Sequence, residues 1–174
     1  SPRRRRARSR PVPQKRVGER LPRHAAIKSQ QADPQVAQIQ QNEDPNSIYY
    51  HRLDTSKIGQ LGHSFGGMST CMSASDPRYK ALATICGTRA LSGVHTPMLF
   101  FCGGKDGTVK CSSVEETFNT VTNQPAFFIN ETEANHGSWV YTGPGGVSLS
   151  SAAAWFRVHL MNDTANRKYF YGPN

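Results

Sequence analysis

Short apolar runs alternate with amphipathic stretches along residues 34–174. Four of the runs are brief and lack strict alternation of apolar and polar residues, which is typical of strands buried on both faces of a parallel sheet. The strands are expected at residues 57–62, 82–86, 98–102 and 126–129. The pattern therefore predicts an α/β fold with a parallel sheet flanked by helices, in which one helix precedes four strand–helix units.

Capping signals and apolar spacing place the helices. One helix is expected to begin at Pro34, with Asp33 as its N-cap. The others are expected from Phe65 to about Ser75, over residues 112–122 with a Ser N-cap and acids in the first turn, and over residues 148–163. In the last helix, the residues available for burial are Ala153, Phe156, Val158 and Leu160.

Charge is distributed unevenly along the chain, whose formal net charge is +9. Residues 1–33 contain eleven Lys or Arg against two acids, whereas residues 34–174 contain ten of each. The first segment also lacks apolar periodicity, so we expect a disordered tail at 1–33 and a folded domain at 34–174. Clustered arginines can bind nucleic acid or anionic membranes. A solvated tail is the favoured interpretation, and no specific nucleic-acid partner is expected, because no aromatic residue accompanies the arginines.

Several classes of protein find no support in the sequence. No run approaches the ~18–20 apolar residues of a membrane span, and no apolar stretch typical of a signal peptide follows the arginines. The four cysteines form no C-x-x-C pair, so no zinc site is expected. Cys102 and Cys111 flank one loop and are the favoured disulfide pair in an oxidising compartment. The absence of H-E-x-x-H, P-loop and G-x-G-x-x-G patterns predicts no metal and no organic cofactor.

The strongest chemical signal is the pattern Gly-x-Ser-x-Gly, formed by Gly62, Ser64 and Gly66 between a predicted strand and a predicted helix. This context is that of a nucleophile elbow, which holds a serine in a strained conformation at a sharp turn. Side chains at Gly62 and Gly66 are expected to collide across that turn. The amide of Phe65, at the start of the helix, is the expected first oxyanion donor.

A serine nucleophile needs a base held in place by an acid, and on this kind of fold the acid and then the histidine follow the serine in the chain. Asp106 and His136 fit, because both lie on loops after predicted strands, at the carboxyl edge where α/β active sites form. His63 is interpreted as a packing residue, since it adjoins the serine. The remaining candidates are excluded by chain order, lack of a partner acid, position in a helix or closeness to His136: His24, His51, His95, His159, Glu131 and Glu133.

Four segments, in this order, resemble the secreted polyester hydrolases, which include bacterial cutinases and poly(ethylene terephthalate) hydrolases within the α/β-hydrolases. They are DPNSIYYHRLDTSKIGQLGHSFGGMST, DPRYKALATICG, TPMLFFCGGKDGTV and SAAAWFRVHLMNDTANRKYFYGP. The resemblance implies an α/β-hydrolase fold with Ser64 as nucleophile, Asp106 as acid and His136 as base. It also implies a small-molecule or polymeric ester substrate and an extracellular location.

The sequence departs from that family before residue 57, where family members have several strands and a loop that supplies a second oxyanion donor. We therefore expect a chain without the N-terminal strands and with residues 58–61 as an open sheet edge. Gly87 and Thr88 also stand where the family has an aromatic clamp, although Phe65 offers an apolar wall.

The sequence thus predicts a serine hydrolase of carboxylic esters that acts through an acyl-enzyme. A peptidase or amidase with the same triad stays open as an alternative. So does a catalytically impaired, truncated hydrolase whose basic tail binds polyanions.

Overall fold

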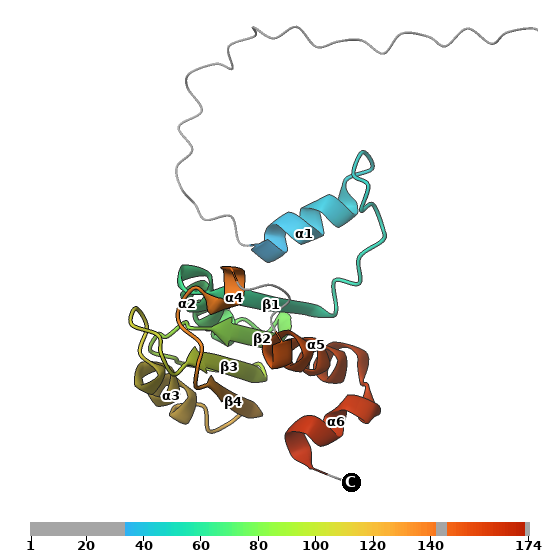
Figure 1. Ribbon diagram of the computed structural model, residues 1–174. Helices are drawn as coiled ribbons and strands as arrows, with labels where there is room; N and C mark the ends of the chain where they lie inside the picture. Colours follow the sequence, from blue (N-terminus) through green and yellow to red (C-terminus); the bar gives the residue numbers. More distant parts are fainter. Residues whose placement is uncertain (1–33, 142–145, 173–174) are drawn as a thin grey trace, which may run out of the picture.

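The computed structural model describes residues 34–141 and 146–172. The predicted tail at 1–33, including the Asp33 cap, lies outside the described residues. At the centre is a parallel sheet with the strand order β1-β2-β3-β4. Its strands are β1 (Ile58–His63), β2 (Tyr79–Ile85), β3 (Met98–Gly103) and β4 (Ala126–Glu131) (Figure 1). The parallel α/β architecture expected from the sequence is confirmed.

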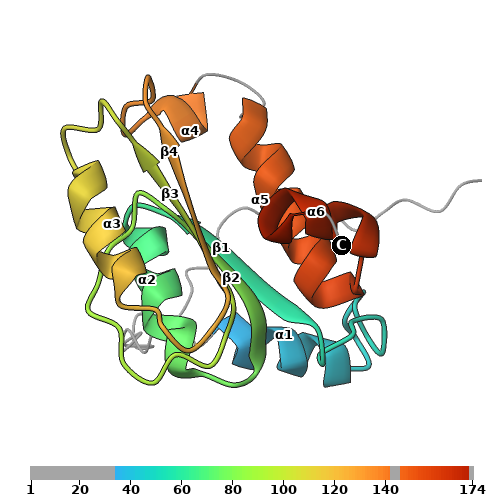
Figure 2. The same cartoon turned by 90° about the horizontal axis from the view of Figure 1, so that it is seen from below.

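Helices cover both faces of this sheet, as Figure 2 shows. The described helices are α1 (Pro34–Glu43), α2 (Phe65–Met72), α3 (Cys111–Asn119), α4 (Ser138–Tyr141), α5 (Gly146–Met161) and α6 (Thr164–Tyr171), with a 3₁₀ turn at Ser73–Ser75. Helices α2 and α3 lie on one face, and α5 and α6 lie on the other. None of the helices within the described ranges is long and apolar enough to cross a membrane.

Strand β3 shows most clearly that the sheet is buried on both faces, since all six of its residues are buried. Successive side chains of a strand point to opposite faces, and this divides its apolar run between two clusters. Phe100 packs in the cluster that contains Val114 of α3. Its neighbour Phe101 packs in the cluster that contains Trp155 of α5. A strand between two helical layers therefore needs apolar residues at every position.

The structure corrects four details of the predicted helices. The connection from β2 to β3 contains no helix, so the second expected strand–helix unit is missing. Helix α3 begins at Cys111 with Lys110 at its N-cap, and it has neither a Ser cap nor acids in its first turn. Ala153 is exposed, whereas Trp155 is buried. Helix α6 was not expected, although Asp163 caps it by accepting hydrogen bonds from Ala165 and Asn166.

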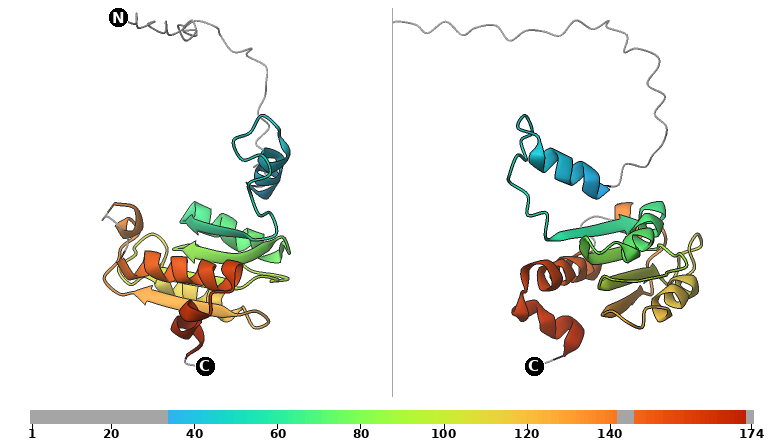
Figure 3. Two further views of the ribbon diagram at one scale, coloured as in Figure 1. Left: turned by 90° about the vertical axis from the view of Figure 1, so that its right-hand side faces the viewer. Right: turned by 180° about the vertical axis from the view of Figure 1, so that it is seen from behind.

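The two sides of β1 differ. In the described part of the chain β1 pairs with β2 alone, so its other edge is open, as the sequence predicts. Leu61 on this strand is 44% exposed. Figure 3 shows α1 beyond this edge, away from the helices that cover the faces of the sheet. The sheet is therefore well enclosed around β2 and β3 and weakly enclosed at β1.

Candidate active site

Ser64 lies at the sharp turn between β1 and α2. Its backbone has φ 55° and ψ −116°, a conformation that a residue with a side chain adopts only at a cost of about 1–3 kcal/mol. Two hydrogen bonds hold it there. The Ser64 amide donates to the Ile85 carbonyl at 2.9 Å, and the Met68 amide donates to the Ser64 carbonyl at 2.9 Å. The neighbouring strand and the following helix thus fix the hydroxyl at the carboxyl end of the sheet.

The two glycines of the pattern have different roles. A Cβ atom on Gly62 would lie 2.1 Å from the carbonyl oxygen of Gly66, which no real contact tolerates. A Cβ atom on Gly66 would meet nothing within 4 Å. The expectation that side chains at both positions would collide is therefore wrong for Gly66. The backbone carbonyl of Gly66 lies close to Gly62, whereas a side chain on Gly66 would point into open space.

Three predicted residues meet at this turn. The Nε2 atom of His136 lies 2.9 Å from Oγ of Ser64. On the other side of the same ring, Nδ1 lies 2.7 Å from Oδ2 of Asp106. The side chain of Asp106 is fully buried, whereas that of His136 is 23% exposed. The hydroxyl, the imidazole and the carboxylate form a continuous chain of hydrogen bonds, with the partly exposed imidazole in the middle and the buried carboxylate at one end.

The Asp106 carboxylate is held in its ionised form. Its Oδ1 atom accepts hydrogen bonds from the amides of Thr108 and Val109, both at 2.8 Å. Burial by itself would raise the pKa of Asp106, but hydrogen bonds from His136, Val109, Cys86 and Thr108 together lower it below its ordinary value. The carboxylate is therefore charged at neutral pH and available to orient the imidazole.

The loops that carry Asp106 and His136 are tied to each other. The amides of Gly104 and Lys105 donate to the carbonyls of Glu131 and Ala134, both at 2.9 Å. The Lys105 ammonium also pairs with the Glu133 carboxylate. These contacts join the two loops to each other independently of their contacts with Ser64.

A disulfide closes the acid loop. It joins Cys102 at the end of β3 to Cys111 at the start of α3, with a Cα–Cα distance of 5.0 Å. This is the pair that the sequence favoured. Asp106 lies between the two cysteines, so the covalent link limits how far its loop can open. Cys71 and Cys86 are free and buried.

His63 makes more contacts with the site than the sequence indicated. The prediction that it packs is correct, because its ring lies beside that of His136 with centroids 4.7 Å apart. It also makes a hydrogen bond that was not expected: Nε2 of His63 donates to the backbone carbonyl of His136 at 2.9 Å. The partner is 73 positions away in the chain. Only adjacency to the serine pointed to His63, and adjacency does not reveal such a bond.

Cys86 was also missed as part of the site. It follows β2, has a positive φ of 47° and is fully buried. Burial, together with the hydrogen bond to Asp106 and the negative charge of that residue, raises the pKa of the Cys86 thiol to about 12. The thiol therefore stays protonated beside the carboxylate. No feature of the sequence around Cys86 indicated this.

The same neighbourhood contains possible metal ligands. Nitrogen and sulfur atoms of His63, Cys86 and His136 all lie within 4.8 Å of one another. Each side chain already has a partner: the His136 carbonyl for His63, Asp106 for Cys86, and Ser64 and Asp106 for His136. Cys86 would also have to lose its proton to bind a metal. The hydrogen-bonded chain accounts for this cluster without a metal.

The histidines that were set aside, where described, lie elsewhere. His51 lies 3.8 Å from the Glu43 carboxylate, and His95 is exposed. The ring of His159 packs on Trp155, with centroids 4.2 Å apart. Burial and the nearby Arg167 lower the pKa of His159 to about 4.

Phe65 is the first residue of α2, follows Ser64 directly and is 82% exposed. The backbone amide of a first helical residue has no acceptor within its own helix. The start of a helix also carries a partial positive charge. The Phe65 amide is therefore suited to bind a negative oxygen next to the serine, and its ring offers an apolar surface there.

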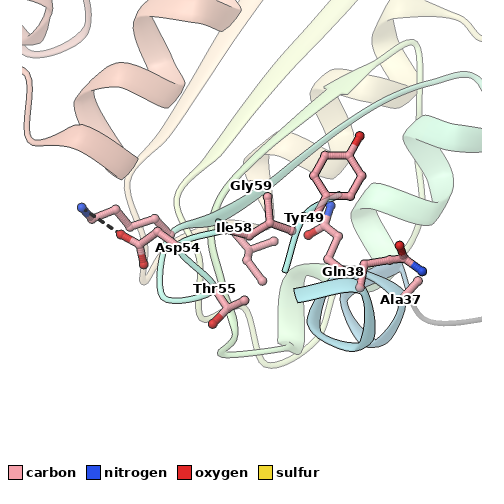
Figure 4. Close-up of a pocket in the computed structure, with 10 residues that line it drawn as sticks. Ala37, Gln38, Tyr49, Asp54, Thr55, Ile58 and Gly59 are labelled. Carbon is pink, nitrogen blue, oxygen red and sulfur yellow. Dashed lines mark ion pairs between the residues drawn. The ribbon is translucent and has the colours of Figure 1, made fainter. Parts of the chain in front are cut away.

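A cavity of about 640 Å³ lies away from this chemistry. Residues of α1 and of the segment that leads into β1 form its walls, including Gln38, Tyr49, Asp54 and Ile58 (Figure 4). Ile58 is the first residue of β1, whereas Ser64 follows the last. This cavity is not the substrate site for Ser64 and His136, because the length of β1 separates it from them.

The comparison with known protein families found a match. The model of a family described as PETase, PET hydrolase-like, matches residues 21–174. No curated protein matches the chain. The family match begins within the segment predicted to be a tail, and the division of the chain at residue 33 stays a prediction. Since the match covers most of the chain and includes every residue of the site, this protein belongs to the PET hydrolase-like family.

Proposed function

We propose that this protein hydrolyses carboxylic esters through a Ser64–His136–Asp106 triad. One observation carries the proposal: a single imidazole has Nε2 2.9 Å from a hydroxyl and Nδ1 2.7 Å from a buried carboxylate. Both distances lie in the range needed for proton transfer by a general base. Membership of a family of hydrolases supports the same reaction class.

The reaction proceeds in two stages. His136 takes the proton of Ser64 as Oγ attacks the ester carbonyl, and Asp106 stabilises the imidazolium that forms. His136 then gives this proton to the leaving alcohol, which leaves an acyl group on Ser64. In the second stage His136 takes a proton from water as the water oxygen attacks the acyl carbonyl. His136 then gives this proton to Oγ of Ser64 as the acyl–oxygen bond breaks, which releases the acid and restores the serine hydroxyl.

The Phe65 amide is the oxyanion donor in this scheme. It lies one residue after the nucleophile, at the positive end of α2. Within the described residues we assign no second donor. A site that lacks one donor is expected to lose about 10²–10³ in kcat. Ester hydrolysis is the favoured activity because an alcohol is a better leaving group than an amine, so esters demand less of the oxyanion site than amides do.

Two features bear on substrate and location. The exposed ring of Phe65 provides an apolar surface beside the serine, which suits an apolar acyl group or a segment of a polymeric ester. The disulfide between Cys102 and Cys111 favours an oxidising compartment, and hence secretion.

The test compares Ser64→Ala with Ser69→Ala, a matched change on α2. With p-nitrophenyl butyrate as substrate, Ser64→Ala should lower kcat by about 10⁴-fold or more, because the nucleophile is lost. Ser69→Ala should retain the activity and the labelling of the wild type by a fluorophosphonate probe. Full activity of Ser64→Ala would refute the proposal. Faster cleavage of the matching anilide would favour an amidase, and an unlabelled, inactive wild type would favour an impaired hydrolase.

A further inference from the structure

The hydrogen bond between His63 and His136 links the two halves of the proposed site. His63 is the last residue of β1 and immediately precedes Ser64. Its Nε2–H donates to the backbone carbonyl of His136 at 2.9 Å, and the two rings are inclined by 43°. A carbonyl only accepts, so Nε2 of His63 carries the proton in this contact. The strand of the nucleophile is thereby attached directly to the residue that serves as its base.

Other contacts hold the base loop at a different place. The acid loop binds it through the carbonyls of Glu131 and Ala134, the second of which is two residues before His136. Further along, the Gly137 amide donates to the Asn135 side chain at 2.9 Å, which shapes the turn but does not reach β1. The bond from His63 acts on the peptide unit of His136 itself. It therefore controls the point from which the imidazole projects toward Ser64.

We propose that His63 is a positioning residue, which acts through its hydrogen bond to the His136 carbonyl and keeps Nε2 of His136 in line with Oγ of Ser64. This inference rests on the proposed function. A displacement of about 1 Å in a reacting group is enough to reduce a rate substantially. His63 touches no reacting atom in this role, so its loss lowers kcat through misalignment of the base.

The test uses a pair of variants that separates the donor from the ring. His63→Phe keeps an aromatic ring beside His136 but removes the donor, whereas His63→Gln places an amide N–H near the original Nε2. His63→Phe should lower kcat for p-nitrophenyl butyrate by about 2- to 10-fold, the range of one neutral hydrogen bond. KM should stay within about twofold, and His63→Gln should restore most of kcat. His95→Phe, the same change at an exposed histidine, is the matched control and should leave kcat unchanged.

A second measurement does not depend on turnover. The proton between Nδ1 of His136 and Asp106 should give a low-field resonance in proton NMR of the wild type. This resonance should broaden or shift in His63→Phe and return in His63→Gln. If both variants keep the wild-type kcat and resonance, or if His63→Phe changes KM alone, the inference is wrong. A wild type that hydrolyses no ester would overturn the proposed function, while the resonances would still decide whether His63 positions the imidazole.

Discussion

The carboxyl edge of the sheet and the outer edge of β1 differ in how tightly their segments are held by contacts. At the carboxyl edge, loops from β3 and β4 are joined by backbone hydrogen bonds, a disulfide closes one of them, and a fully buried carboxylate lies beneath. At the outer edge of β1, Leu61 is 44% exposed, and a cavity of about 640 Å³ separates the strand from α1. Several independent contacts therefore fix the loops of the first region, whereas few contacts cover the second.

This difference shows which part of the molecule the proposed chemistry depends on. The contacts that align Ser64, His136 and Asp106 come from the four strands and the loops that follow them. Contacts within the α1 region are mostly local, such as the Leu53 amide bound to the Asn42 side chain at 2.9 Å. The alignment of the site is thus separable from the covering of β1, and changes in the two regions should have different consequences.

The largest expected effect concerns two aspartates, one in each region. Asp106→Asn should lower kcat for ester hydrolysis by about 10⁴-fold, because a neutral amide no longer fixes the imidazole tautomer. Asp54→Asn, on the exposed segment before β1, should leave kcat unchanged. Equal effects of the two changes would break the distinction between the regions.

Asp106 should also shape the response of stability to acid. Its pKa is lowered in the folded state, so the stability that it contributes is present at neutral pH and is lost as the pH falls below about 4. Denaturant unfolding of the wild type from pH 7 to pH 3 should show this loss of stability. In Asp106→Asn the contribution of this carboxylate to the loss should be absent.

The next effect separates the glycines of the elbow. Gly62→Ala should reduce the free energy of unfolding by about 2–4 kcal/mol, because its Cβ atom would overlap the Gly66 carbonyl. Gly66→Ala, within α2, should be neutral or stabilise by up to about 1 kcal/mol, since alanine favours the helix. Chemical denaturation measures both. A strongly destabilised Gly66→Ala would mean that the turn is tighter than the structure indicates.

The disulfide offers a test of how rigid the acid loop must be. Replacing Cys102 and Cys111 together by serine should cost about 2–3 kcal/mol of stability, as expected for a link across nine positions. Activity should fall as well, because Asp106 lies within the loop. Dithiothreitol should affect the wild type in the same direction and leave the double variant unchanged. An unaltered kcat in the variant would show that hydrogen bonds alone hold the loop.

The smallest effect is expected at the open edge. Leu61→Thr should change the free energy of unfolding by less than about 0.5 kcal/mol, because Leu61 is exposed at the open edge and threonine suits a strand. Leu99→Thr, the same substitution on fully buried β3, should cost several times more. A large loss at Leu61 would reveal that this edge is covered in solution.

Part of the site was predictable from local patterns. The turn after the first apolar run has glycines two residues before and two residues after a serine, and chain order selected Asp106 and His136 among the later candidates. These inferences depend on strand–turn–helix chemistry, which is a property of neighbouring residues. The cap of α6 at Asp163 was an equally local signal that the prediction overlooked.

Other features resisted prediction because the interacting groups are far apart in the sequence. Apolar spacing favoured Ala153 for burial, but the orientation of α5 on the sheet buries Trp155. The start of α3 was assigned to a serine, whereas the helix begins at the disulfide cysteine. In each case the local pattern allowed more than one arrangement, and packing selected one.

The sequence by itself determined the parallel α/β class, the Gly-x-Ser-x-Gly turn and the order of Ser64, Asp106 and His136, because each depends on residue type and spacing along the chain. Tertiary structure alone decided that the imidazole reaches both partners, that Cys86 is buried near the Asp106 carboxylate, and that His63 binds the backbone of His136. These contacts join strands and loops that only the folded sheet brings together. Their geometry follows from how the strands align, which no single segment encodes.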